Sequence, residues 1–224
     1  MLSIKTTIKN LDFDSLIRFG LPILKANPPE IDSNLFIKQG VKKLLEVEDS
    51  KIFTVLEIIP DSIKLILASK IIANSHEKIE AFITSFAESQ NLYFKINDIS
   101  VSKEFVEKSF DISCVVSEID YNSFVKKFLP SVHLDDSQKI NMFLNSLFNA
   151  MISEMDSTER LLSAIPESVK DNLVSFFIEQ NSIKLCESLT AFIMGKKINL
   201  KVDSLLVEIP CKSDNLIGAT SIGE

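Results

Sequence analysis

The stretch IKTTIKNLDFDSLIRFGLP, residues 4–22, decides the fold, because it returns as ISCVVSEIDYNSFVKKFLP at residues 112–130. The offset is 108 residues, and the identical pairs are Ile4/Ile112, Asp12/Asp120, Ser15/Ser123, Leu21/Leu129 and Pro22/Pro130. Further on, at an offset of 106, the identities include Pro60/Pro166, Ser62/Ser168, Phe86/Phe192, Lys95/Lys201 and Val101/Val207. Two single-residue gaps explain the drift in offset, so the sequence predicts an internal duplication.

Each copy is expected to fold as a strand, a run of helices and a second strand. Apolar and polar residues alternate over 2–9 and 110–117, which is typical of a sheet with one buried and one solvated face. The closing strands change the phase of this alternation once. The change predicts a bulge at Asn97-Asp98 and another at Asp203-Ser204.

The link between the copies decides the expected architecture. SKEFVEK at 102–108 is too short for a crossover helix, so strands 92–101 and 109–118 are expected to pair antiparallel. A single copy would hold one strand pair, and isolated hairpins are marginally stable. We therefore expect an α+β, predominantly helical fold. In it, two tandem β-α(n)-β repeats form one pseudo-twofold domain, with a four-stranded, largely antiparallel or mixed sheet covered by helices.

The expected boundaries are residues 1–107 for repeat A and 108–209 for repeat B, with 210–224 as a flexible C-terminal tail. Helices are expected at 33–47 and 140–154. Recurring prolines mark other helix ends: the first helices bend or end at Pro22 and Pro130, and later ones open at Pro60 and Pro166. The later helices share one apolar face, at Ile63/Val169, Leu67/Leu173, Ile71/Phe177 and Ile72/Ile178.

The composition is that of a soluble globular protein. A net charge of −7 without a basic stripe argues against a nucleic-acid partner. The mean hydropathy is +0.19, but apolar runs fall short of the roughly 18 residues of a transmembrane segment, and no secretory signal is expected. Cys114, Cys186 and Cys211 share no metal-ligand spacing, which favours a reduced, cytoplasmic setting. The tryptophan-free, Ile/Lys/Asn/Ser-rich composition suggests a bacterium.

Side chains that carry catalysis are scarce. His76 and His133 do not recur, and no zinc, P-loop or nucleophile-elbow motif occurs, so we expect no enzyme activity, metal or cofactor. A weak candidate polar site is formed by the recurring Asp12, Asp120, Lys95 and Lys201. Helix capping by the aspartates and solvated lysines are the simpler interpretation. Solvated helix positions are likewise expected for Lys64/Lys170 and Lys78/Lys184.

Positions that are apolar in only one copy cannot belong to a core shared by both. The clearest examples are Leu65 and Ile66, which stand where the second copy has Asp171 and Asn172. Such positions either pack between the copies or form an outward apolar patch. The candidate interaction surface consists of Leu65, Ile66, Leu147, Phe148 and Phe176.

These observations favour a non-enzymatic interaction or assembly module that binds an unknown protein partner or a second copy of itself. The alternative is a protein that binds an apolar ligand or lipid, because a sheet under helices rich in Phe, Ile and Leu can enclose a cavity. An enzyme with an unfamiliar site is the third hypothesis.

Overall fold

The first half of the chain contributes two strands and five of the described helices. The structure is a computed structural model that describes residues 1–29, 35–48, 51–102, 108–131 and 158–209. The elements are β1 Leu2–Lys9, α1 Phe13–Ala26, α2 Leu35–Glu46, α3 Ile52–Glu57, α4 Asp61–Ala73, α5 His76–Ser89 and β2 Lys95–Val101. The expected helix at 33–47 corresponds to α2.

The second half repeats the order of strand, helices and strand. Its elements are β3 Phe110–Ser117, α6 Tyr121–Phe128, a 3-10 turn Leu129–Ser131, α8 Thr158–Ala164, α9 Glu167–Gln180, α10 Ser182–Met194 and β4 Lys201–Glu208. The prediction of a largely helical α+β chain is confirmed. Several expectations lie outside the described residues: the helix at 140–154, the tail at 210–224, His133, Leu147, Phe148 and Cys211.

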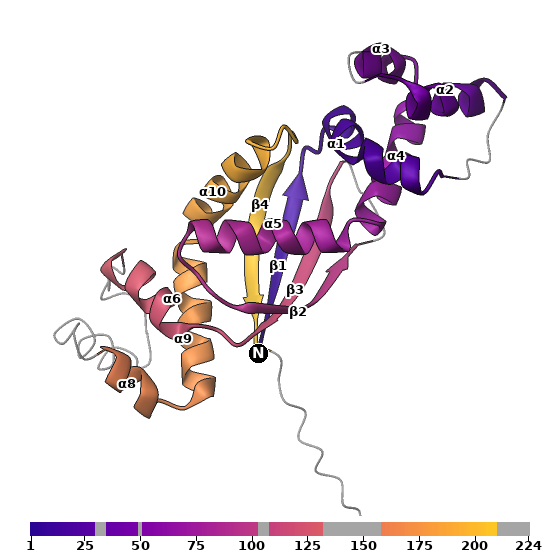
Figure 1. The fold of residues 1–224 in the computed structure, drawn as a ribbon. Helices are drawn as coiled ribbons and strands as arrows, with labels where there is room; N and C mark the ends of the chain where they lie inside the picture. The colour runs from indigo at the N-terminus through magenta and orange to yellow at the C-terminus, as the bar shows by residue number, and fades with distance from the viewer. Residues whose placement is uncertain (30–34, 49–50, 103–107, 132–157, 210–224) are drawn as a thin grey trace, which may run out of the picture.

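The four strands form one antiparallel sheet in the order β2-β3-β1-β4 (Figure 1). The predicted antiparallel pairing of β2 with β3 is confirmed. The sequence left the rest of the strand order open, and the structure places β1 between β3 and β4, which both come from the second half. The sheet is therefore built by strands of the two halves together.

The registers of the strand pairs correspond between the two halves. Lys5 of β1 lies directly opposite Ser113 of β3, the residue 108 positions later. At the edges, the β1–β4 register shifts at Asp203 and the β2–β3 register shifts at Asn97. Both predicted bulges are confirmed. A bulge adds one residue to the edge strand, so the apolar side chains beyond it return to the helix-covered face.

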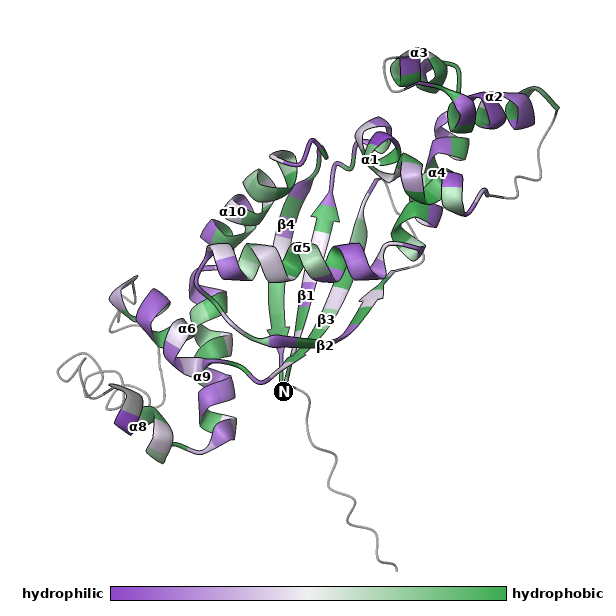
Figure 2. Ribbon diagram, in the orientation of Figure 1, coloured by the Kyte–Doolittle hydropathy of each residue, from purple (hydrophilic) through white to green (hydrophobic). Residues whose placement is uncertain are grey.

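Helix α5 crosses the sheet and α10 packs beside β4, while the other described helices lie at the two ends of the sheet. In Figure 1, α5 runs across the strands, α1 to α4 extend from one end of the sheet, and α6, α8 and α9 lie at the other. Figure 2 shows hydrophobic and hydrophilic residues mixed along the strands and along α5. α5 contacts α10 through the rings of Phe86 and Phe192, whose centroids are 5.7 Å apart.

The buried side chains form two clusters, one at each end of the sheet. The first contains α1 to α4 and takes in Ile198, which follows α10 in the second half. The second contains α6, α8 and α9 and takes in Leu2 and Leu92 from the first half. Each cluster is thus completed by residues of the other half.

The recurring prolines take different places in the helices. Pro22 lies within α1, which continues to Ala26, whereas Pro130 lies in the 3-10 turn after α6 has ended. Pro60 and Pro166 are the N-caps of α4 and α9, one residue before the expected first helical position. The predicted core face of α4 is confirmed, because its four apolar positions are buried: Ile63, Leu67, Ile71 and Ile72.

Candidate apolar binding site

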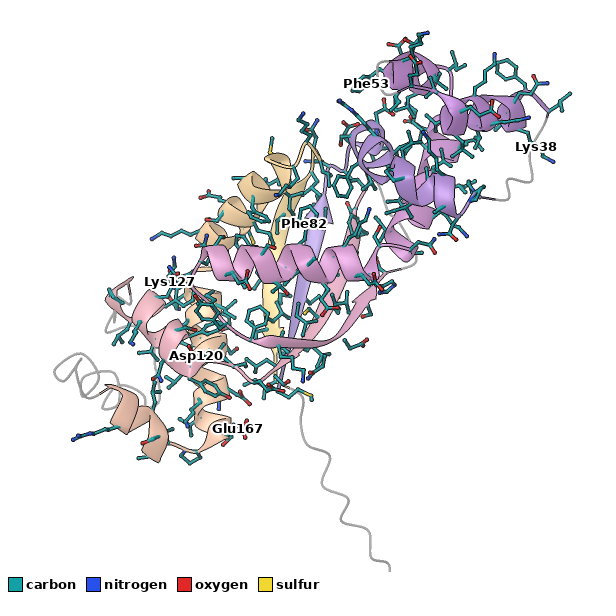
Figure 3. All side chains as sticks on the ribbon, in the orientation of Figure 1. Lys38, Phe53, Phe82, Asp120, Lys127 and Glu167 are labelled. Atoms are coloured by element: carbon teal, nitrogen blue, oxygen red, sulfur yellow. The ribbon has the colours of Figure 1, made fainter. Side chains whose placement is uncertain are left out.

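A partly enclosed cavity of about 120 Å³ lies between the sheet and helices α1, α4, α5 and α10. Ile8 and Phe110 of the two central strands line it from the sheet side. Phe82 of α5, labelled in Figure 3, lines it from the helix side. The lining is almost wholly apolar, and Lys78 is the single charged residue among the described residues that form it. Such a space favours an apolar group over water, which needs several polar partners.

A close contact between α1 and α4 shapes one wall of the cavity. Gly20 is buried in α1, and a Cβ atom at this position would lie 2.6 Å from Cδ1 of Ile71. A larger side chain at position 20 would therefore clash with Ile71, and glycine permits this contact between the two helices. This approach holds Leu16 and Ile71 at the edge of the cavity.

Matched positions of the two halves differ in side-chain volume around this cavity, and the differences run in both directions. The sequence alignment pairs Leu16, Ile71 and Leu200 of the lining with Phe124, Phe177 and Phe94, but it pairs the lining rings Phe19, Phe82 and Phe110 with Lys127, Ser188 and Leu2. Phe124 and Phe177 are almost completely buried in the second cluster. Their rings form a connected group, with centroids 6.5 Å apart for Phe94–Phe124 and 6.1 Å apart for Phe128–Phe177. The second cluster is thus filled by aromatic rings at positions that differ from those of the rings around the cavity.

Cations and aromatic rings adjoin the cavity on the side of α5. Phe19 packs edge-to-face on Phe82, and Phe82 packs in the same way on Phe192. The ammonium group of Lys78 lies 5.7 Å from the ring centroid of Phe19, and that of Lys196 lies 5.7 Å from the centroid of Phe192. Two positive charges therefore stand over the ends of a row of three rings.

The aspartates of the predicted polar site are helix caps. Asp12 accepts a hydrogen bond from the Asp14 N–H at 3.1 Å. Asp120 accepts hydrogen bonds from the N–H groups of Asn122 and Ser123 at 3.1 and 3.3 Å. The backbone N–H of Asp12 donates a hydrogen bond to the carbonyl of Asn199 in the second half. The backbone N–H of Asp120 donates one to the carbonyl of Tyr93 in the first half. The capping interpretation is confirmed.

The structure does not bring the lysines of the predicted polar site together. Lys95 lies on β2 and Lys201 on β4, at opposite edges of the sheet. Lys95 forms an ion pair with Glu118 at 3.0 Å. Lys201 lies 4.0 Å from Asp203, which also receives a 2.8 Å contact from Lys9. The hydrogen bond from Lys9 lowers the pKa of Asp203.

The described members of the predicted interaction surface do not form one patch. Leu65 packs against the first core cluster and Phe176 against the second, so they lie at opposite ends of the sheet. Ile66 is exposed on α4. Leu65 and its counterpart Asp171 differ because their neighbours differ. Asp171 accepts a 2.8 Å hydrogen bond from the hydroxyl of Tyr121. In the first half the residue that corresponds to Tyr121 is Phe13, which has no hydroxyl group and needs no acceptor.

One of the recurring lysines expected to be solvated is buried. Lys64 is only 11 % exposed and forms an ion pair with Asp14 at 2.7 Å. Its counterpart Lys170 instead lies over the ring of Tyr121, at 5.6 Å from the centroid. The expectation is therefore wrong for Lys64. The counterpart of Asp14 is Asn122, so the second half offers no carboxylate at this position.

The described thiols are protected from reaction. Burial raises the pKa of Cys114 to about 12, with Glu80 and Asp98 adding to the effect. Burial also raises the pKa of Cys186, and Asp203 and Glu187 act in the same direction. Both thiols are protonated at neutral pH and are poor nucleophiles. Within the described part of the chain, no group of three or more His, Cys, Asp or Glu side chains could hold a metal ion.

The sequence predicted that a sheet under helices can enclose an apolar cavity, but it did not indicate where. Matched positions of the two halves differ in volume with opposite signs, as in Leu16 against Phe124 and Phe82 against Ser188, so these differences do not locate the cavity. No protein-family model matches the chain, and neither does any curated protein or solved structure. None of the described helices is long and apolar enough to cross a membrane. The cavity is therefore the feature that carries the functional argument.

Proposed function

We propose that the protein is a non-enzymatic binding module that holds a small apolar group in the cavity beneath α5. The cavity itself is the observation that supports this function. Its volume of about 120 Å³ is close to that of an engineered cavity of about 150 Å³ that binds benzene. It is smaller than the roughly 300–1,000 Å³ of sites for drug-sized ligands, so the expected occupant is small.

Benzene is a suitable neutral probe of this proposal. A ligand that binds only the folded state raises the melting temperature, so benzene in the buffer should stabilise the wild-type protein. Ile71→Phe introduces the residue found at the corresponding position of the second half and should abolish the stabilisation. Ile66→Phe, at an exposed position on the same helix, is the matched control and should leave it unchanged.

Leu16→Phe provides a second filling variant in case Ile71→Phe is poorly folded. Circular dichroism should show native helix content for any variant that is used. If benzene stabilises the wild type and both filling variants equally, the cavity is not the binding site. If benzene stabilises none of the proteins, the proposal of an apolar-ligand module is wrong.

A second candidate function is the assembly of copies of this chain through α2 and α3. Leu35 and Phe36 at the start of α2 are 72 % and 68 % exposed, and Phe53 and Ile58 around α3 are also exposed. Exposed large apolar side chains on successive helices are typical of protein interfaces. Light scattering after size exclusion should detect a dimer that Phe36→Ser weakens. Lys38→Ser on the same helix is the control (Figure 3), and a monomeric wild type would refute this candidate.

We also propose that the chain arose by duplication and that its halves share a pseudo-twofold axis. The axis would pass through the Lys5–Ser113 pair, because these two residues correspond in the alignment and lie opposite each other. Backbone conformations support this view: positive φ angles recur at Asn10 and Glu118, and at Asn91 and Lys197. Residues other than glycine rarely adopt this conformation, so two matched occurrences are informative. Superposition of the halves in an experimental structure tests the proposal, and mismatched positions for α4 and α9 would contradict it.

A further inference from the structure

The size of the cavity limits the length of an aliphatic chain that it can hold. A cavity of about 150 Å³ accepts the six carbon atoms of benzene, so about 120 Å³ accepts roughly five carbons in the same packing. A longer chain would have to extend into the open side. This limit excludes a long-chain fatty acid as a fully enclosed occupant.

The charge beside the cavity selects among small apolar molecules. The ammonium group of Lys78 lies over the Phe19 ring, and among the described residues it forms no ion pair. Lys78 is also in the first turn of α5, where the helix dipole adds to its positive charge. The other polar lining residues are Thr6 and Ser75, and the Ser75 hydroxyl donates its hydrogen bond to the Ile71 carbonyl. The cavity thus combines an apolar space with one available cation.

The second half supplies an internal comparison for this lysine. Lys184 occupies the corresponding position on α10, but the side chains at the corresponding lining positions include Phe124 and Phe177. A lysine is therefore present at this position in both halves, and Lys78 of the first half is combined with the described cavity. Charge complementarity at this combination points to an anion with a short aliphatic chain.

We propose that the cavity binds a free aliphatic monocarboxylate of about six carbons, with its chain among Leu16, Ile71 and Phe82 and its carboxylate at Lys78. This inference rests on the proposed apolar-ligand function and adds the chemical class of the ligand. The ion pair would be partly exposed to solvent, so most of the affinity would come from burial of the chain.

Calorimetric titration of the full-length protein with hexanoate and with 1-hexanol tests this assignment. Hexanoate should bind more tightly than the alcohol, and Lys78→Met should weaken hexanoate by about two- to fivefold while leaving 1-hexanol unchanged. Lys184→Met is the matched control and should change neither. From butanoate to hexanoate the affinity should rise about fourfold per methylene, and it should then level off towards decanoate.

The outcomes separate this inference from the function on which it rests. If both compounds bind equally and Lys78→Met has no effect, the cavity holds apolar groups but the carboxylate assignment is wrong. If neither compound binds, and benzene also fails to stabilise the protein, both proposals are wrong. If hexanoate binding survives Ile71→Phe and Leu16→Phe in folded protein, the carboxylate binds elsewhere and the assignment is overturned.

Discussion

The two halves of the chain have the same order of strand, helices and strand but differ in the side chains that fill their interiors. Both begin their first helix with a capping aspartate, and both shift register at the same place in the edge strand. The difference lies under the helices, where Phe124 and Phe177 correspond to Leu16 and Ile71 beside the cavity, whereas Phe82 of the cavity corresponds to Ser188. Caps and bulges fix the backbone, whereas exchange among apolar residues changes only volume. A binding space can therefore open in one half without altering the fold.

The largest expected effect comes from emptying the filled half. Phe177 is fully buried and stacks on Phe128, so Phe177→Ala should lower the free energy of unfolding by about 3–5 kcal/mol. Urea denaturation followed by circular dichroism measures this loss. Phe36→Ala on the exposed face of α2 is the control and should stay within about 0.5 kcal/mol of wild type. A loss below about 1 kcal/mol for Phe177→Ala would mean that the second half is not tightly packed.

The close approach of α1 and α4 gives the next effect. Gly20→Ala would place a Cβ against the Ile71 side chain, and such overpacking costs about 1–3 kcal/mol. Adding Ile71→Ala removes the clash, so the two changes should be coupled by about 0.5–3 kcal/mol in a double-mutant cycle. Purely additive losses would show that the helices can move apart. The second half has Phe128 at this position and has no such restriction on side-chain size.

A titratable residue also distinguishes the halves. Cys114 of the second half corresponds to Thr6, and its pKa is about 12 in the folded chain against 9.0 for an ordinary thiol. Above pH 9 the unfolded state loses this proton first, so stability falls as the pH rises, by up to about 1.4 kcal/mol per pH unit. When the pH is raised from 8 to 10.5, the free energy of unfolding of Cys114→Thr should fall by about 2 kcal/mol less than that of the wild type, as measured by urea denaturation. Equal losses would show that the thiol ionises normally.

The capping aspartates provide the smallest effect and a test of equivalence. Asp12→Ala and Asp120→Ala should each cost about 1 kcal/mol, because each leaves N–H groups of the first helical turn without an acceptor. Asparagine at either position should restore most of the loss, since its side-chain oxygen also accepts. Thermal unfolding of the four variants measures the losses. A cost at only one position would show that the two caps are not equivalent.

The sequence was sufficient for those parts of the fold that local chemistry decides. Alternating residues predicted the strands, and the phase changes at Asn97 and Asp203 predicted the bulges, because a register error would reverse the buried face. The same reasoning left the neighbours of β1 open. Whether β1 pairs with β2 or with β4 depends on how the helices place the strands, and residue periodicity carries no information about that placement.

The candidate site was less predictable than the fold. Cavities depend on the summed volumes of side chains from several elements, and no single residue around this one is unusual. Lys64 was misinterpreted for a similar reason, because its buried ion pair with Asp14 forms between two helices. The interpretation of Leu65 required the contact between Tyr121 and Asp171 in the other half. Such pairs become evident only when both members are located in space.

The position of β1 between β3 and β4 has a consequence for synthesis of the chain. Both neighbours of β1 belong to the second half, and Ile4 pairs with Val207, almost at the end of the described residues. At about 5–20 residues per second, a ribosome needs roughly 10–40 s to make the intervening chain. During that time β1 lacks its final neighbour. The edge of β1 that pairs with β4 therefore stays open until β4 has been synthesised.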